Sequence, residues 1–238
     1  MIIDADTLFG FWPSRHVDVS LDKLQRLMER HNVELACACS ARGICYDFQE
    51  GNQETIDVAR SNSCLVPVLT VDPRRYLGVA EEVRRRVAEG HKVFRLYPEY
   101  QNWTVNTPSA RKVLSILEDA GATIMLGGTA AQAIPEIRSL QVPVILTWVH
   151  YYYLSDVLAY ADEMPHLYLS TRFLIGPRSL EIAVSALGAE RLIYGSQAPL
   201  VSMASALKLV LTADLTPDQR GAILSGNMQR LLGNSLRS

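Results

Sequence analysis

Residues 1–10 read MIIDADTLFG, which is the pattern of an opening strand in a parallel α/β fold. The stretch begins with apolar residues and ends at Gly10, where a turn can follow. Side chains alternate between the two faces of a strand, so Asp4 and Asp6 are predicted to share a face. We expect this to be the inner face of a closed sheet.

Eight short apolar runs rich in β-branched residues are predicted as strands, and helical patterns separate them. The predicted strands are residues 2–5, 33–39, 64–70, 93–96, 123–126, 142–147, 167–169 and 191–194. The predicted helical segments are residues 21–28, 56–59, 79–87, 113–117, 133–137, 154–161 and 180–187. Units of about 30 residues fit parallel strands joined by right-handed crossover helices. Eight strands favour a closed (β/α)8 barrel over an open doubly wound sheet.

Residues at the ends of the helical patterns support these assignments. Gly90, Gly121 and Gly188 stand where a left-handed residue can end a helix. Thr107 precedes a proline, and residues 216–219 read TPDQ, the pattern of a capping box. With no linker or low-complexity segment between them, residues 1–238 are predicted to form a single α/β barrel domain.

Composition limits the other classes of protein. The chain is 48% hydrophobic and has a net charge of −2, so nothing indicates a nucleic-acid partner. Arg84, Arg85 and Arg86 form the densest basic cluster and are expected on a solvated helix face. No apolar run approaches the roughly 20 residues of a membrane helix, and no signal sequence is apparent. A cytoplasmic protein without a membrane partner is expected.

The four cysteines lie in the first third of the chain and do not form a disulfide pattern. Cys37 and Cys39 share a strand face and could bind a soft metal, but no second ligand pair accompanies them. We therefore expect buried thiols.

Three longer motifs resemble those of the amidohydrolase superfamily of metal-dependent hydrolases. Residues 187–199, LGAERLIYGSQAP, resemble its last strand, and residues 215–233 resemble its closing helix with an Ile-Leu-x-x-Asn-x-x-Arg-Leu core. Residues 90–98, GHKVFRLYP, resemble its fourth strand, and residues 1–10 resemble its opening Ile-Asp-Ala-His-x-His-x-Gly. The resemblance implies a TIM barrel and an activity among the hydrolases and decarboxylases.

The resemblance also locates five places where the family holds its metal ligands. These places hold Asp6, Leu8, Leu126, Trp148 and Gln197. Leucine has no donor atom, and an indole nitrogen only donates hydrogen bonds. A catalytic divalent ion usually needs about three protein ligands, so the sequence predicts no catalytic metal and no other cofactor.

Arg95 is predicted inside the barrel. Alternation places Arg95 and Tyr97 on one face of the fourth strand, and Phe94 with Leu96 on the face that meets the helices. A buried guanidinium needs a carboxylate or an anionic ligand. Two alternatives remain open at this point, an internal pair with Asp6 or the binding of an anion.

Other residues at the strand ends extend the candidate site. Gly127 and Gly128 precede a helix, where free amides attract anions, and Arg172 follows the seventh strand. A lone His150 is expected as a hydrogen-bonded rim residue rather than a metal ligand. Asp6 and His150, with Asp4, could form an acid/base set, and the alternative is that Asp6 caps a turn or pairs with a nearby arginine. The ligand-binding candidates are Asp4, Arg95, Tyr97, Gly127, Gly128, Trp148, Arg172 and Gln197.

Two hypotheses about function follow. The first is an amidohydrolase-like barrel without the divalent metal centre, a non-catalytic or divergent protein that binds a small molecule, possibly an anion. The second is an active hydrolase or decarboxylase that uses Asp6, Arg95 and His150 without a metal or with an atypical one. Tyr151, Tyr152 and Tyr153 either pack a loop near the site or cover the interface of a homo-oligomer.

Overall fold

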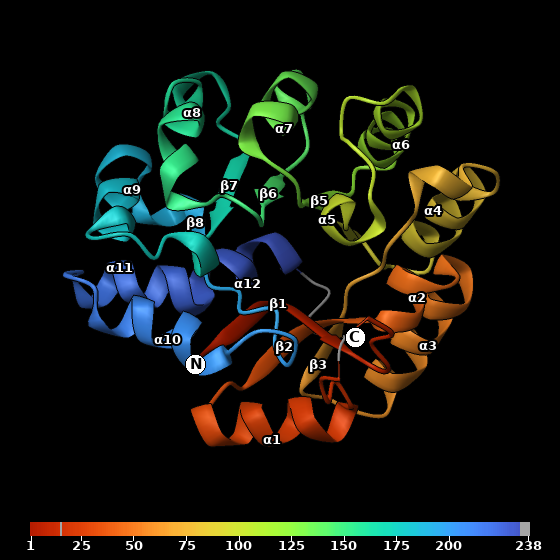
Figure 1. The fold of residues 1–238 in the computed structure, drawn as a ribbon, viewed down its shortest axis with the longest axis horizontal. Coiled ribbons are helices and arrows are strands. Elements are labelled where there is room, and N and C mark those ends of the chain that lie inside the picture. The colour runs from red at the N-terminus through yellow and green to blue at the C-terminus, as the bar shows by residue number, and fades with distance from the viewer. Residues whose placement is uncertain (15, 234–238) are drawn as a thin grey trace.

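The computed structural model describes residues 1–14 and 16–233, and within them the eight predicted strands form a closed parallel barrel (Figure 1). The strands are β1 (Ile3–Phe9), β2 (Leu35–Ser40), β3 (Leu65–Pro67), β4 (Val93–Leu96), β5 (Thr123–Leu126), β6 (Val144–Leu146), β7 (Leu167–Ser170) and β8 (Leu192–Ile193). β1 to β3 pair in order, and so do β4 to β8. Isolated parallel β-bridges, from Thr7 to Ala198 and from Leu69 to Phe94, join the three-stranded sheet to the five-stranded sheet at both edges. The predicted (β/α)8 barrel is therefore confirmed.

Helices surround the barrel as a ring. They are α1 (Leu21–His31), α2 (Ala41–Cys45), α3 (Phe48–Arg60), α4 (Val79–Ala88), α5 (Pro98–Gln101), α6 (Pro108–Asp119), α7 (Ala130–Ile137), α8 (Leu154–Leu158), α9 (Ser179–Leu187), α10 (Met203–Thr212), α11 (Pro217–Gly221) and α12 (Asn227–Leu232). The Thr107 cap and the capping box of Thr216 and Gln219 are both present. The longest helix in the described part of the chain, α3, has 13 residues and is too short to cross a bilayer.

Two apolar layers fix which side chains face the barrel interior. Ile3, Ala5, Val93 and Met125 pack together inside the barrel, with Met228 of α12 among them. The larger layer lies between the strands and the helices, and it includes Phe94 and Leu96. Arg95 lies between those two residues and is fully buried, so the structure confirms its predicted inner-face position.

A bulge in β1 changes the predicted position of Asp4. Asp4 pairs with Ala36 of β2, but Thr7 pairs with Ala38, so β1 has one extra residue between them. Before the bulge Ile3 and Ala5 face inward, and Asp4 therefore faces away from the interior. The predicted inner face for Asp4 is wrong, because simple alternation does not include a bulge.

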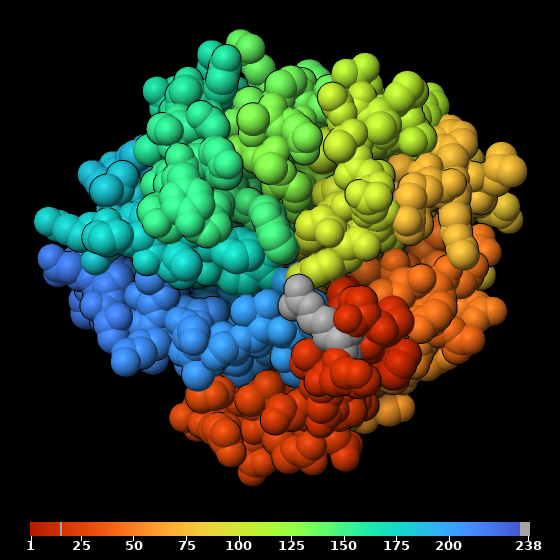
Figure 2. All heavy atoms as spheres, in the orientation of Figure 1, coloured from red at the N-terminus to blue at the C-terminus, as the bar shows by residue number. Residues whose placement is uncertain are grey.

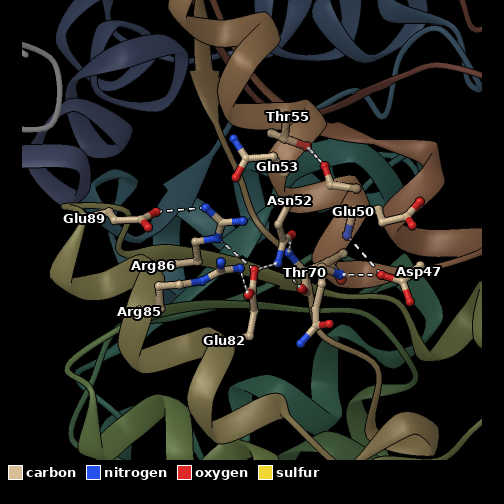
Figure 3. A network of polar contacts seen from close by, with 12 residues as sticks. Asp47, Glu50, Asn52, Gln53, Thr55, Thr70, Glu82, Arg85, Arg86 and Glu89 are labelled. Atoms are coloured by element: carbon tan, nitrogen blue, oxygen red, sulfur yellow. Dashed lines mark hydrogen bonds and ion pairs between the residues drawn. The ribbon is translucent and has the colours of Figure 1, made fainter.

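Arg86 is not solvated, which corrects the prediction for the basic cluster. Its side chain is only 3% exposed, and its Nε donates to Oε1 of Glu82 at 2.8 Å. Glu82 is buried too, and it accepts from Nδ2 of Asn52, whose amide also pairs with the backbone of Thr70. This network joins α3, α4 and the segment after β3 (Figure 3). Arg84 and Arg85 are exposed, as predicted.

Candidate functional site at the mouth of the barrel

The mouth of the barrel consists of the carboxyl ends of the eight strands and the residues directly after them. Figure 1 looks onto this end, and α5 lies within the ring of helices there. The structure brings together most of the side chains predicted for the site. Those at the mouth are Asp6, Arg95, Tyr97, Trp148, Arg172 and Gln197.

Arg95 contacts two carboxylates in the mouth. Its Nε lies 3.6 Å from Oδ1 of Asp6, and its Nη2 donates to Oε1 of Glu99 at 2.6 Å. The guanidinium also donates to the carbonyl of Leu96 and lies over the ring of Tyr97, at 4.3 Å from its centroid. Burial opposes the charged form, but Glu99 and Asp6 outweigh it and raise the pKa of Arg95. The internal pair with Asp6 is present, and Glu99 is a second partner that the sequence reasoning missed.

Arg172 contacts neutral groups. It donates to Oε1 of Gln197 and to the carbonyl of Thr147, and it lies over the rings of Trp148 and Phe173 at 5.0 Å and 4.2 Å. Across residues 1–14 and 16–233, no carboxylate oxygen lies within 4.0 Å of this guanidinium. Burial lowers the pKa of Arg172, with only partial compensation from the more distant Asp6. Arg172 is thus a buried cation without an ion-pair partner.

Tyr100 of α5 extends across the mouth. Its hydroxyl donates to Oε1 of Gln197 on the opposite side of the barrel at 2.8 Å. Its ring makes edge contacts with Trp12 after β1 and Trp148 after β6, at centroid distances of 4.9 Å and 6.1 Å. In the space-filling view, the segments near residues 10, 100 and 200 meet close to the middle of this face (Figure 2). Tyr100 therefore spans the mouth and contacts residues on both sides of it.

Several buried polar atoms of the mouth have no hydrogen-bond partner. They are Asp6 Oδ2, Arg95 Nε, Glu99 Oε2, Arg172 Nε and Gln197 Nε2. Unpaired buried polar atoms are rare in folded proteins, because each loses its interactions with water. Their concentration here, with both donors and acceptors, leaves hydrogen bonds open to water or to a polar ligand.

Asp4 belongs to a separate polar cluster, which joins the outer face of β1 to Ser196 in the turn after β8. Its carboxylate accepts hydrogen bonds from the backbone N and Oγ of Ser196, at 2.9 Å and 2.5 Å, and from the backbone N of Asp6 at 3.2 Å. Burial raises the pKa of Asp4 to about 7, although these hydrogen bonds favour the charged form. The carboxylate holds β1 and the turn after β8 together and does not face the mouth.

The raised pKa of Asp4 predicts a pH-dependent stability. Between the unfolded pKa near 3.8 and the folded pKa of about 7, the folded chain binds more protons than the unfolded chain. Its free energy of unfolding therefore falls as the pH rises through this window, by up to about 1.4 kcal/mol per pH unit. We expect Asp4→Asn to lack this slope. Urea unfolding of both proteins from pH 4.5 to 8 measures the difference, and parallel pH profiles would contradict the assignment.

The structure does not bring His150 and Asp6 into one acid/base set. The His150 ring stacks on Tyr152 at a centroid distance of 3.9 Å and on Phe173 at 5.6 Å. Its buried Nδ1 has no hydrogen-bond partner. The polar contact of Asp6 is instead with Arg95. His150 is therefore placed in an aromatic cluster at the rim.

The Gly127–Gly128 turn is not an open anion site. The amide of Gly127 donates to the carbonyl of Leu96 at 3.2 Å. A β-carbon on Gly127 would lie 1.8 Å from Oε2 of Glu99, so the glycine leaves space for this carboxylate. Gly128 has a φ of +88°, a conformation that glycine adopts readily. The anion beside this turn is the protein's own Glu99.

The residues at the mouth do not fit a divalent metal. Leu8 packs against Cys39 and Tyr97, and Leu126 belongs to the layer that faces the helices. Asp6 and Gln197 remain as oxygen donors, and the guanidinium groups of Arg95 and Arg172 are next to them. Glu99 adds a third oxygen donor, but Arg95 holds its carboxylate, and the two buried guanidinium groups oppose the binding of a further cation here.

The rest of the described chain offers no replacement for this donor set. Within residues 1–14 and 16–233, no three His, Cys, Asp or Glu residues are grouped as metal ligands would be. Cys37 and Cys39 are buried free thiols, and burial raises the pKa of Cys39 to about 12. The predicted buried thiols are confirmed.

Comparisons with known proteins define the family. The model of the family described as amidohydrolase matches residues 48–233, and the chain belongs to this family. No protein with a curated description matches the chain in sequence.

Solved structures of the same architecture cover almost the whole chain. The 5-carboxyvanillate decarboxylase from Sphingomonas paucimobilis is 13% identical, with a TM-score of 0.75 over 97% of this chain and 98% of that chain. The 2,6-dihydroxybenzoate decarboxylase from Rhizobium is 12% identical, with a TM-score of 0.72 over 97% and 98%. An amidohydrolase from Burkholderia multivorans with bound zinc is 18% identical, with a TM-score of 0.74 over 98% and 99%. At these identities the comparison supports the fold alone.

Proposed function

We propose that this amidohydrolase-family barrel binds a small carboxylate at its mouth through Arg172, without the family's divalent metal chemistry. One observation carries the proposal, the buried guanidinium of Arg172, which has an unpaired Nε and no carboxylate partner among the residues that the structure describes. A buried cation of this kind gains most from an anion that accepts its hydrogen bonds. Nε2 of Gln197 is a second unpaired donor beside it.

Aromatic side chains favour a planar ligand at this place. Trp148 and Phe173 lie on Arg172 and are only partly buried, so they form the side through which a ligand would enter. Aromatic rings stack on planar molecules and exclude water from the charged group. The two decarboxylases of the same fold are named for aromatic carboxylates, which supports this ligand class.

Calorimetric titration with 2,6-dihydroxybenzoate tests the proposal. We expect the wild-type protein to bind it and Arg172→Gln to bind at least about tenfold more weakly, because a charge-assisted hydrogen bond is lost. Arg138→Gln is the matched control, since Arg138 also lies over an aromatic ring, Tyr160, but is exposed at the end of α7 and pairs with Glu163 on the surface. Equal affinity of wild type and Arg172→Gln would refute the role of Arg172.

A second candidate function is the metal-independent decarboxylation of the same aromatic carboxylates, in which a proton replaces the carboxylate that leaves as carbon dioxide. The decarboxylase names of the two structural neighbours favour it, with Asp6, which lies in the mouth beside Arg95, as its proton-transfer candidate. Loss of 2,6-dihydroxybenzoate from the titrated sample, with release of carbon dioxide, would identify this activity. Asp6→Asn should then abolish turnover.

A further inference from the structure

The short helix α5 carries two side chains that occupy the mouth. Pro98 begins the helix directly after β4, and Glu99 and Tyr100 follow. Glu99 turns back to Arg95, whereas Tyr100 crosses to Gln197, in the turn after β8. Two side chains of this four-residue helix therefore cover the mouth, Glu99 beside Arg95 and Tyr100 beside Trp148.

Glu99 occupies the position of a bound anion. One carboxylate oxygen accepts from Nη2 of Arg95, and the other lies against Gly127, where no β-carbon interferes. Oε2 has no hydrogen-bond partner, although the Glu99 side chain is only 6% exposed. Asp6 lies 3.6 Å from Arg95 and remains as a second carboxylate beside the guanidinium when the Glu99 side chain leaves.

We propose that Arg95 and the Gly127 turn form a second anion subsite, and that Glu99 is its internal competitor. An external carboxylate or sulfate displaces the Glu99 side chain, and α5 with Tyr100 moves out of the mouth. The inference goes beyond the proposed function, because that function depends on Arg172 and this subsite depends on Arg95. In this arrangement Glu99 blocks the subsite until an external anion displaces its side chain.

The three tryptophans of the chain report the position of α5. Trp12 and Trp148 contact the ring of Tyr100, and Nε1 of Trp103 donates to Oε1 of Gln101 at 2.9 Å. Movement of α5 changes the surroundings of all three indoles. Tryptophan emission is therefore a direct measurement of the opening.

The test compares sulfate binding in wild type, Glu99→Gln and the control Glu163→Gln. Glu163 pairs with Arg138 on the surface, so its change leaves the mouth intact. With sodium chloride of equal ionic strength as the reference, we expect Glu99→Gln to bind sulfate at least about tenfold more tightly than wild type. Its tryptophan emission should shift at lower sulfate concentration. Unchanged affinity in Glu99→Gln, or the same gain in Glu163→Gln, would overturn the inference.

A crystal of Glu99→Gln grown with selenate locates the anion. Anomalous density within hydrogen-bond distance of Arg95 supports the subsite. Density at Arg172 alone overturns the Arg95 subsite but leaves the proposed function standing. Density at Arg95 alone supports the subsite and speaks against anion binding by Arg172. Should Glu99→Gln be too unstable to crystallise, its melting temperature must rise more steeply with sulfate than that of wild type. An equal rise in both proteins would also overturn the inference.

Discussion

Arg95→Met is expected to lower the free energy of unfolding by about 3 to 5 kcal/mol, because removing one partner of a buried ion pair leaves uncompensated charge. In this protein two carboxylates would lose their cation. Asp6 is 3% exposed and the side chain of Glu99 is 6% exposed, so water cannot replace the guanidinium. Methionine fills similar space without charge. Urea unfolding at pH 7 measures the loss.

A triple variant separates charge from packing in this prediction. Arg95→Met with Asp6→Asn and Glu99→Gln removes all three charges and retains the shape of the side chains. Buried ion pairs can be replaced by neutral groups with little loss, so the triple variant should recover most of the stability. A loss below about 1 kcal/mol in Arg95→Met would show that the ion pair does not contribute as the structure indicates.

The second large effect is expected at Glu82. Glu82→Gln should destabilise the protein by about 3 kcal/mol, since the buried Arg86 loses its buried carboxylate. Glu89 remains as a partner of Arg86 at 2.9 Å but is 40% exposed, which places the loss at the lower end of the usual range. The amide of Asn52 also loses a charged acceptor. Urea unfolding again provides the measurement.

Glu163→Gln is the matched control for Glu82→Gln. Its ion pair with Arg138 is about half exposed on both sides, so its removal should change stability by less than about 0.5 kcal/mol. Similar losses in the two variants would indicate that the contacts of Glu82 are no stronger than those of a surface pair.

The architecture was predictable because its signals are local and repeated. Apolar runs located all eight strands, and β4 and β5 have the predicted bounds. Gly90 and Gly121 have positive φ angles directly after α4 and α6, as expected for residues that end helices. These features depend on a few neighbouring residues, which a single sequence displays.

The site was less predictable because its contacts depend on the path of the chain between strands. The bulge in β1 moved Asp4 to the outer face, and no residue type in that stretch marks a bulge. Glu99 and Tyr100 were not predicted, because they lie on α5 and strand alternation locates only residues within the strands. The available signal was that Glu99 follows Arg95 by four residues, just past the proline at the end of β4.

Calorimetric titration of 2,6-dihydroxybenzoate after exhaustive chelation, repeated with one equivalent of zinc, tests the central claim most directly. The account predicts equal binding in both samples, because the guanidinium of Arg172 holds the carboxylate and no metal takes part. It also predicts less than one equivalent of zinc, manganese, iron or nickel in the purified protein. Binding that requires zinc, or stoichiometric metal held through Asp6 and Gln197, would contradict the account.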